Sequence, residues 1–212
     1  SILFILGLKK LGHPRTAPTG NLYGALGMLV AVVVTIAQMD FGLTNNFTLI
    51  IAGLAIGGSI GYYMAVKVEM TGMPEMVALF NGFGGAASAL VALSESWKYI
   101  YEGDKLPVGL DLGVIYTAAG LSALVGWMTL SGSILAMYKL KGGVEIFGKW
   151  YKTPTWGPTW LNPIKGFLFF AVIVLIGLQI NNQTSELYMW LIIIISFILG
   201  IIIQLFRENR SK

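Results

Sequence analysis

The sequence lacks cysteine altogether and has little charge. None of the 212 residues is a cysteine and only 11% are Asp, Glu, Lys or Arg, whereas 56% are hydrophobic. The absence of cysteine excludes disulfides, thiolate catalysis and cysteine-ligated metal sites. A soluble domain carries about 25% charged residues, so this composition indicates a chain that lies mostly in a lipid bilayer.

Histidine is almost absent as well. The one histidine, His13, lies in the basic segment "KKLGHPRTAPTG". Histidine is the usual proton carrier near neutral pH, but a basic loop ahead of a helix is at the wrong depth for a relay inside the membrane. We therefore expect a solvated loop residue at this position, and no metal site in the chain.

Long apolar runs make up most of the chain. A helix needs about 20 apolar residues to cross a bilayer, and six segments reach that length. Residues 1–8 would form only about 12 Å of helix, which predicts the end of a truncated helix. The predicted fold class is all-α, a polytopic transmembrane helix bundle with one transmembrane domain over residues 1–212. The predicted helices are 1–8 (partial), 20–38, 47–66, 73–94, 112–138, 164–180 and 187–206.

The basic residues divide unequally between the two sides of this predicted bundle. Twelve of the 14 Lys and Arg residues fall on one side, and only Lys98 and Lys105 fall on the other. Cytoplasmic loops of membrane proteins carry the excess of basic residues. The loops 9–20 and 139–165 and the C-terminus are therefore predicted to be cytoplasmic. Because the net charge of +4 is scattered over helix ends, it indicates a bilayer as partner and no nucleic acid.

Two predicted helices carry polar stripes that small residues accompany. At 100° per residue, Asn81, Gly85 and Ser88 share one side of the helix 73–94. The same spacing on the next helix aligns Ser122, Gly126, Thr129 and Ser133. Such stripes would line a narrow hydrated path, or they would be ordinary polar contacts between helices. The stripes alone favour the second interpretation, and the clustering of Asn with Ser and glycines keeps the first one open.

Glycines also recur in the helix 47–66, where Gly53, Gly57 and Gly61 stand four residues apart. Small residues at this spacing let another helix approach closely, so the sequence predicts a packing surface. A phosphate-binding loop is excluded, because these glycines do not lie between a strand and a helix.

Glu75 follows Pro74 at the start of the helix that carries Asn81. The helix dipole favours a carboxylate there, and proline in the first turn loses no hydrogen bond. A helix start therefore explains the motif "MPE", and a role at a cytoplasmic vestibule stays open.

The segment "KVEMTGMPEMVALFNGFGGAASALVAL" resembles the signature of the β subunit of proton-translocating NAD(P) transhydrogenase. Three further segments are similar to other parts of its membrane domain: "LKKLGHPRTAPTGNLYGALGMLVAVVVTI", "GGSIGYYMAVKVEMT" and "LSGSILAMYKLKG". The resemblance runs from Ser1 to about Gly200.

The resemblance implies an enzyme that couples hydride transfer between NADH and NADP+ to proton passage across the bacterial cytoplasmic (inner) membrane. In this family the NAD-binding domain belongs to the α part, and the NADP-binding domain follows the β membrane helices. The sequence contains neither nucleotide site, so we expect this chain to bind no cofactor and the whole enzyme to use NAD(H) and NADP(H). The resemblance also implies a homodimer of the whole assembly.

The same resemblance assigns roles to particular positions. Asn81 matches the position where many members have the channel histidine, and Ser133 with Gly132 matches a channel-lining Gly-Ser pair. An amide does not protonate near neutral pH, and some members with Asn here have the histidine on a membrane helix of a separate α-type subunit. The resulting proton path comprises Asn81, Gly85, Ser88, Thr129, Gly132 and Ser133, with Glu75 as a further candidate.

The chain departs from the family at both ends. Compared with the family, we expect the first helix to lack its beginning, and we expect "FILGIIIQLFRENRSK" to stand where the family continues with a Gly-Gly-Ala-Asp-Met-Pro segment, further helices and the NADP-binding domain. We therefore expect no catalysis by this chain alone. Two other functions stay open: a non-catalytic membrane scaffold, and a small-solute secondary transporter. The transporter is the weaker alternative, because no charged residue lies deep in a predicted helix.

Overall fold

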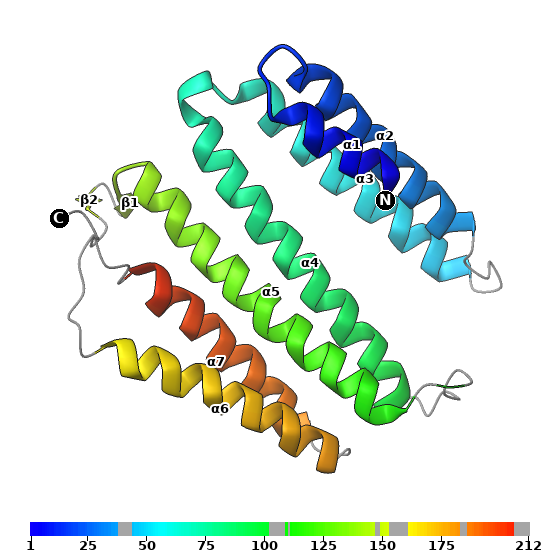
Figure 1. Ribbon diagram of the computed structural model, residues 1–212, viewed down its shortest axis with the longest axis vertical. Helices are drawn as coiled ribbons and strands as arrows, with labels where there is room; N and C mark the ends of the chain where they lie inside the picture. Colours follow the sequence, from blue (N-terminus) through cyan, green and yellow to red (C-terminus); the bar gives the residue numbers. More distant parts are fainter. Residues whose placement is uncertain are drawn as a thin grey trace. The chain divides into compact units, whose positions relative to one another are not determined.

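The computed structural model describes residues 1–37, 44–101, 109, 111–146, 149–152, 161–182 and 186–205. Within these residues the chain forms seven α-helices, one short 3-10 helix and one β-hairpin (Figure 1). The helices are α1 (Ile2–Leu11), α2 (Ala17–Ala37), α3 (Thr44–Lys67), η1 (Met70–Gly72), α4 (Met73–Tyr101), α5 (Leu112–Leu140), α6 (Leu161–Asn181) and α7 (Glu186–Leu205). The strands β1 (Val144–Ile146) and β2 (Lys149–Tyr151) pair antiparallel, with Val144 opposite Tyr151.

Six of the described helices, α2 to α7, are long and apolar enough to cross a membrane. The predicted all-α transmembrane bundle is thereby confirmed. Helix α1 has ten residues, too few to cross a bilayer. Helix α4 continues to Tyr101, beyond residue 94 where its predicted end lay. The predicted helix ends at residues 38 and 206 lie outside the described residues.

The chain forms two compact units, Ser1–Val66 and Lys67–Lys212. The single transmembrane domain over residues 1–212 stays a prediction.

In the unit Ser1–Val66, glycines bring α1 and α2 together as an antiparallel hairpin. A Cβ atom on Gly20 would lie only 2.7 Å from the carbonyl oxygen of Gly7, so neither helix tolerates a side chain at this crossing. The hydroxyl of Thr16 closes the turn by donating to the carbonyl oxygen of Lys10 at 2.5 Å. The ammonium of Lys10 in turn lies 4.6 Å from the ring centre of Tyr23, within the range of a cation–π contact.

The glycines of α3 have open surroundings in this chain. A Cβ atom on Gly53, Gly57 or Gly61 would meet no atom within 4 Å. The packing surface predicted for these glycines therefore stays a prediction.

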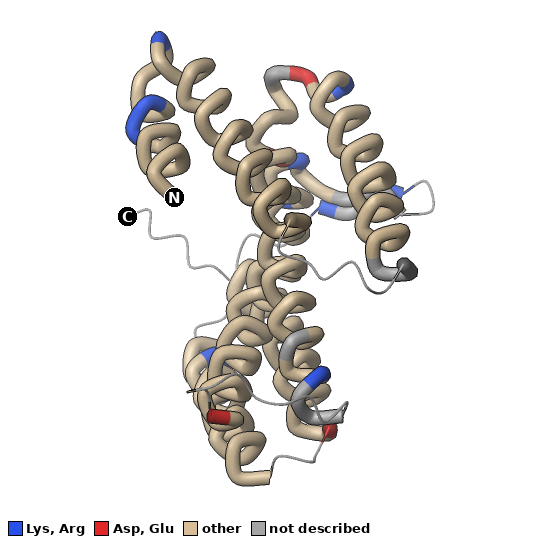
Figure 2. Tube along the Cα trace, turned by 90° about the vertical axis from the view of Figure 1, so that its right-hand side faces the viewer, with Lys and Arg blue, Asp and Glu red and all other residues tan. Residues whose placement is uncertain are grey.

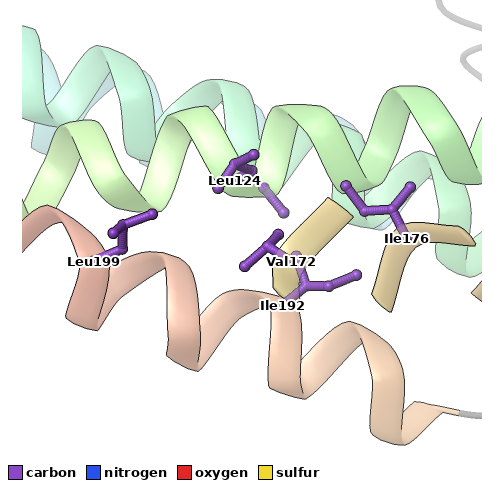
Figure 3. Packing of buried hydrophobic residues seen from close by; sticks show 6 residues of the cluster. Leu124, Val172, Ile176, Ile192 and Leu199 are labelled. Carbon is purple, nitrogen blue, oxygen red and sulfur yellow. The ribbon is translucent and has the colours of Figure 1, made fainter. Parts of the chain in front are cut away.

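In the unit Lys67–Lys212, α5 packs against α4, α6 and α7, and α6 packs against α7. The ribbon shows α5 and α7 running in the same direction, with α4 and α6 running the opposite way (Figure 1). The core lies where α5, α6 and α7 meet, as the close-up of Leu124, Val172, Ile176, Ile192 and Leu199 shows (Figure 3). In lipid, helices associate through van der Waals packing rather than through the hydrophobic effect. The fit of these side chains therefore determines how α5, α6 and α7 assemble.

The parallel helices α5 and α7 are also tied together near their C-terminal ends. A Cβ atom on Gly200 of α7 would lie 2.9 Å from the Cα atom of Met128, so the helix backbones nearly touch. Further along, the ammonium of Lys139 donates to the carbonyl oxygen of Gln204 and, at 3.1 Å, to that of Leu205. One side chain of α5 thus binds the last described carbonyls of α7.

Charged residues lie at the helix ends in this unit (Figure 2). Lys139, Lys141 and Lys165 stand at one end of the bundle, while Asp111 and Glu186 stand at the other. No described span carries a charged residue in its middle third. This distribution leaves uncharged groups, namely amides, hydroxyls and the indole of Trp127, as the polar side chains deep in the described spans.

Candidate functional site

Helices α4 and α5 approach each other most closely where glycines face each other. A Cβ atom on Gly126 would lie 2.6 Å from the Cβ atom of Ala89, and one on Gly85 would lie 2.8 Å from that of Thr129. Both distances are shorter than Cβ atoms show in proteins. Gly85 of the predicted stripe therefore serves the contact between the two helices.

Asn81 and Ser133 join the two predicted stripes directly. The amide nitrogen Nδ2 of Asn81 on α4 donates to the hydroxyl oxygen of Ser133 on α5 at 3.0 Å. Ser133 is buried, with 8% of its surface exposed, whereas Asn81 is exposed. The amide therefore bonds to α5 and still presents part of its surface outside the pair.

The other stripe residues make different contacts. The hydroxyl of Ser88 donates to the carbonyl oxygen of Gly84, in its own helix, at 3.0 Å. Thr129 turns its methyl group toward Gly85, since the Cγ2 atom would lie 3.0 Å from a Cβ atom there. A Cβ atom on Gly132 would lie 3.5 Å from the carbonyl oxygen of Gly200 in α7. Of these polar side chains, only Ser133 thus bonds to Asn81.

Two grooves meet at Asn81. The first has a volume of about 450 Å³ and is lined by Asn81, Gly84, Gly85, Ser88, Ser122, Val125, Gly126 and Thr129. The second has a volume of about 240 Å³ and is lined by Asn81, Met128, Thr129, Gly132, Ser133, Gly200, Ile203 and Gln204. Asn81 and Thr129 line both grooves, so the Asn81–Ser133 hydrogen bond lies at their border.

All the predicted path residues except Glu75 line one of these grooves. Glu75 lies in the first turn of α4, about 9 Å from Asn81 along the helix axis. The sequence did not associate the α7 residues Gly200 and Gln204 with this site. Gly200 interrupts the apolar run "FILGIII", and this was the one signal of a close helix contact on α7.

The polar side chains that line the two grooves form hydrogen bonds but carry no charge. Amide and hydroxyl groups donate and accept hydrogen bonds, and neither titrates near neutral pH. The two grooves can therefore hold and orient water, but a group that takes up a proton must come from outside them. In the described part of the chain, no cluster of three or more His, Cys, Asp or Glu residues could hold a metal ion.

Comparison with known proteins identifies the family. Residues 1–206 match the family model of the NAD(P) transhydrogenase beta subunit. The chain belongs to the NAD(P) transhydrogenase beta subunit family. Two sequences named NAD(P) transhydrogenase subunit beta, one from Rhodospirillum rubrum and one from a named strain of that species, are each 34% identical to the chain over 145 residues.

The family assignment confirms the resemblance to the beta subunit that the motifs around Asn81 indicated, and the six spanning helices agree with a multi-pass membrane protein. The similarity to the two beta subunits covers 66% of this chain and 30% of each relative. The alignment thus leaves most of the length of each of these two beta subunits uncovered.

Proposed function

We propose that this chain is the membrane proton-channel component of NAD(P) transhydrogenase. It couples proton translocation to hydride transfer between NADH and NADP+, and other domains carry out that transfer. The observation that carries the proposal is the hydrogen bond from Asn81 to Ser133 at the border of two grooves. A carboxamide in hydrocarbon needs hydrogen-bond partners, and water in these grooves would supply those that Ser133 does not.

The partner in this proposal is an α-type membrane subunit that supplies an intramembrane histidine. Asn81 is exposed, and a Cβ atom on the neighbouring Gly84 would meet nothing within 4 Å. This leaves space for an imidazole beside the amide. The NAD- and NADP-binding domains complete the enzyme, which we propose to be a homodimer, and this chain binds neither nucleotide.

The function is tested by reconstituting the chain with its partner subunits in lipid vesicles. We expect hydride exchange to change the pH inside the vesicles, and an uncoupler to abolish that pH change. The nucleotide-binding parts without this chain should exchange hydride with no proton movement. Equal pH changes in vesicles that lack the chain would contradict the proposal.

The proposed location is the bacterial cytoplasmic membrane, with the C-terminus on the cytoplasmic side. The chain has no cysteine of its own, so single cysteines report the orientation directly. Lys141→Cys and Asn182→Cys place a thiol at exposed positions after α5 and α6. In intact cells, a membrane-impermeant thiol reagent should label the cysteine at position 182 and spare the one at 141. The reverse pattern would overturn the orientation.

A non-catalytic scaffold is the second candidate. The close contact of Gly85 and Gly126, together with the bond of Ser88 to its own helix, is what helix packing alone requires. The proton-channel function and the scaffold function predict different effects of replacing Asn81 on proton pumping and hydride exchange.

A further inference from the structure

A buried amide lies beside the C-terminal part of α4, beyond the grooves at Asn81. Gln179 on α6 has only 2% of its surface exposed, and its side-chain oxygen Oε1 has no hydrogen-bond partner among the described residues. A buried carbonyl oxygen without a partner is costly in an apolar environment. Serine hydroxyls in a similar position can turn to a carbonyl of their own helix. The amide oxygen of Gln179 cannot bond to such a carbonyl oxygen, because both oxygens are hydrogen-bond acceptors.

Gln179 lines a small cavity between the end of α4, the end of α6 and the start of α7. The lining residues are Leu93, Ser96, Trp97, Gln179, Glu186, Met189, Trp190 and Ile193. The space open to the centre of a water molecule is about 10 Å³, close to the ~10–15 Å³ that a single water molecule needs. The cavity therefore has room for one water molecule and not for a larger ligand.

A second buried polar group faces the same cavity. Ser96 of α4 has 1% of its surface exposed, and its hydroxyl donates to the carbonyl oxygen of Leu93 at 2.9 Å. Its proton is thus in use, while the lone pairs of Oγ remain able to accept. The lining thus has two acceptors on buried residues, Gln179 Oε1 and Ser96 Oγ, whereas its other acceptor, the carboxylate of Glu186, belongs to an exposed residue. A molecule that donates twice would join the two buried acceptors.

We propose that this cavity is a binding site for one buried water molecule, which donates one hydrogen bond to Gln179 Oε1 and the other to Ser96 Oγ. The water links α4 to α6 beside the first turns of α7. Ser96 lies 15 residues after Asn81, about 22 Å along the helix axis. The site shares no lining residue with the grooves at Asn81, and it does not depend on the function proposed for them.

Met189 makes the water detectable. It lines the cavity and has only 6% of its surface exposed, so bulk solvent hardly reaches it. X-ray irradiation of the full chain with its partner subunits in lipid nanodiscs would turn a bound water into a hydroxyl radical next to this thioether. We expect oxidation of Met189 in the wild type, read by mass spectrometry of the digested protein.

The Gln179→Leu variant should lower this oxidation several-fold, because an apolar side chain of similar size removes the acceptor that holds the water. The matched control is Asn182→Leu, which removes an exposed amide at the same helix end and should leave oxidation of Met189 unchanged. Unchanged oxidation in Gln179→Leu would overturn the proposal.

Should Gln179→Leu fail to assemble, a high-resolution cryo-EM map of the wild-type complex decides instead. A density peak within hydrogen-bond distance of both Gln179 Oε1 and Ser96 Oγ is expected. An empty cavity at a resolution where other buried waters are seen would overturn the site.

Discussion

The Gly126→Ala variant is expected to lose most of its folded protein, although it adds a single methyl group. The added Cβ atom would lie 2.6 Å from the Cβ atom of Ala89 and would also press on the carbonyl oxygen of Gly85. Neither atom is the end of a flexible side chain, so the helices α4 and α5 must separate. Overpacking of this kind costs about 3 kcal/mol, and a membrane bundle held by van der Waals contacts has little to offset it. Thermal unfolding in detergent would report the loss as a lower midpoint.

Gly84→Ala is the matched control for this prediction. It makes the same chemical change on the facing helix, one residue from Gly85, where an added Cβ atom meets nothing within 4 Å. Alanine is about 1 kcal/mol better than glycine in a helix interior, so the control should be as stable as the wild type or slightly more stable. Equal stability of Gly126→Ala and Gly84→Ala would mean that α4 and α5 do not touch at Gly126.

The Asn81→Leu variant is expected to lose proton pumping while it keeps hydride exchange. Leucine fills the border between the two grooves with an apolar side chain, and it removes the donor that bonds to Ser133. An interhelical hydrogen bond in a membrane is worth about 1 kcal/mol, so the complex should still assemble. Proton movement and nucleotide exchange, measured on the same purified and reconstituted variant, separate the two effects.

Further variants show whether the hydrogen bond itself matters. Asn81→His should retain more pumping than Asn81→Leu, because the imidazole restores a hydrogen-bonding group that can also carry a proton. Ser133→Ala should lower pumping, since it removes the acceptor of the Asn81 amide.

The matched control for Ser133→Ala is Ser131→Ala. Ser131 is buried in the same helix, and its hydroxyl donates to the carbonyl oxygens of Trp127 and Met128 in that helix. This control should leave pumping unchanged. A scaffold predicts otherwise, because Asn81→Leu would then lower all activities together or none. Normal pumping with leucine at position 81 would end the assignment of a proton path.

The spans were predictable because lipid demands long apolar helices, and the sequence supplies runs of that length. The residues at which these helices end were less predictable. Helix α4 continues through Ser96 and Lys98 to Tyr101, since backbone hydrogen bonds extend a helix past the first polar residues. Helical periodicity also predicted that Asn81 and Ser133 each belong to a polar stripe on their own helix, and the structure joins the two stripes.

Helical periodicity could not predict the contacts that a third helix makes with α4 and α5. The pattern of a single helix states which residues share a side, but not which neighbour covers that side. For this reason the sequence did not associate Gly200 and Gln204 of α7 with the groove at Ser133. It also gave no sign that Gln179 is buried, because one amide near the end of an apolar helix resembles a residue at the water boundary.

The parallel course of α5 and α7 has an electrostatic consequence. Each helix carries about half a negative charge at its C-terminal end, and in a parallel pair the two add up to about one elementary charge on the same side. The ammonium of Lys139 binds the carbonyl oxygens of Gln204 and Leu205 at that end, so one positive charge balances two helix dipoles. Gln204 also lines the groove that contains Ser133. Lys139, six residues along α5 from Ser133, therefore places a positive charge beside this end of the groove.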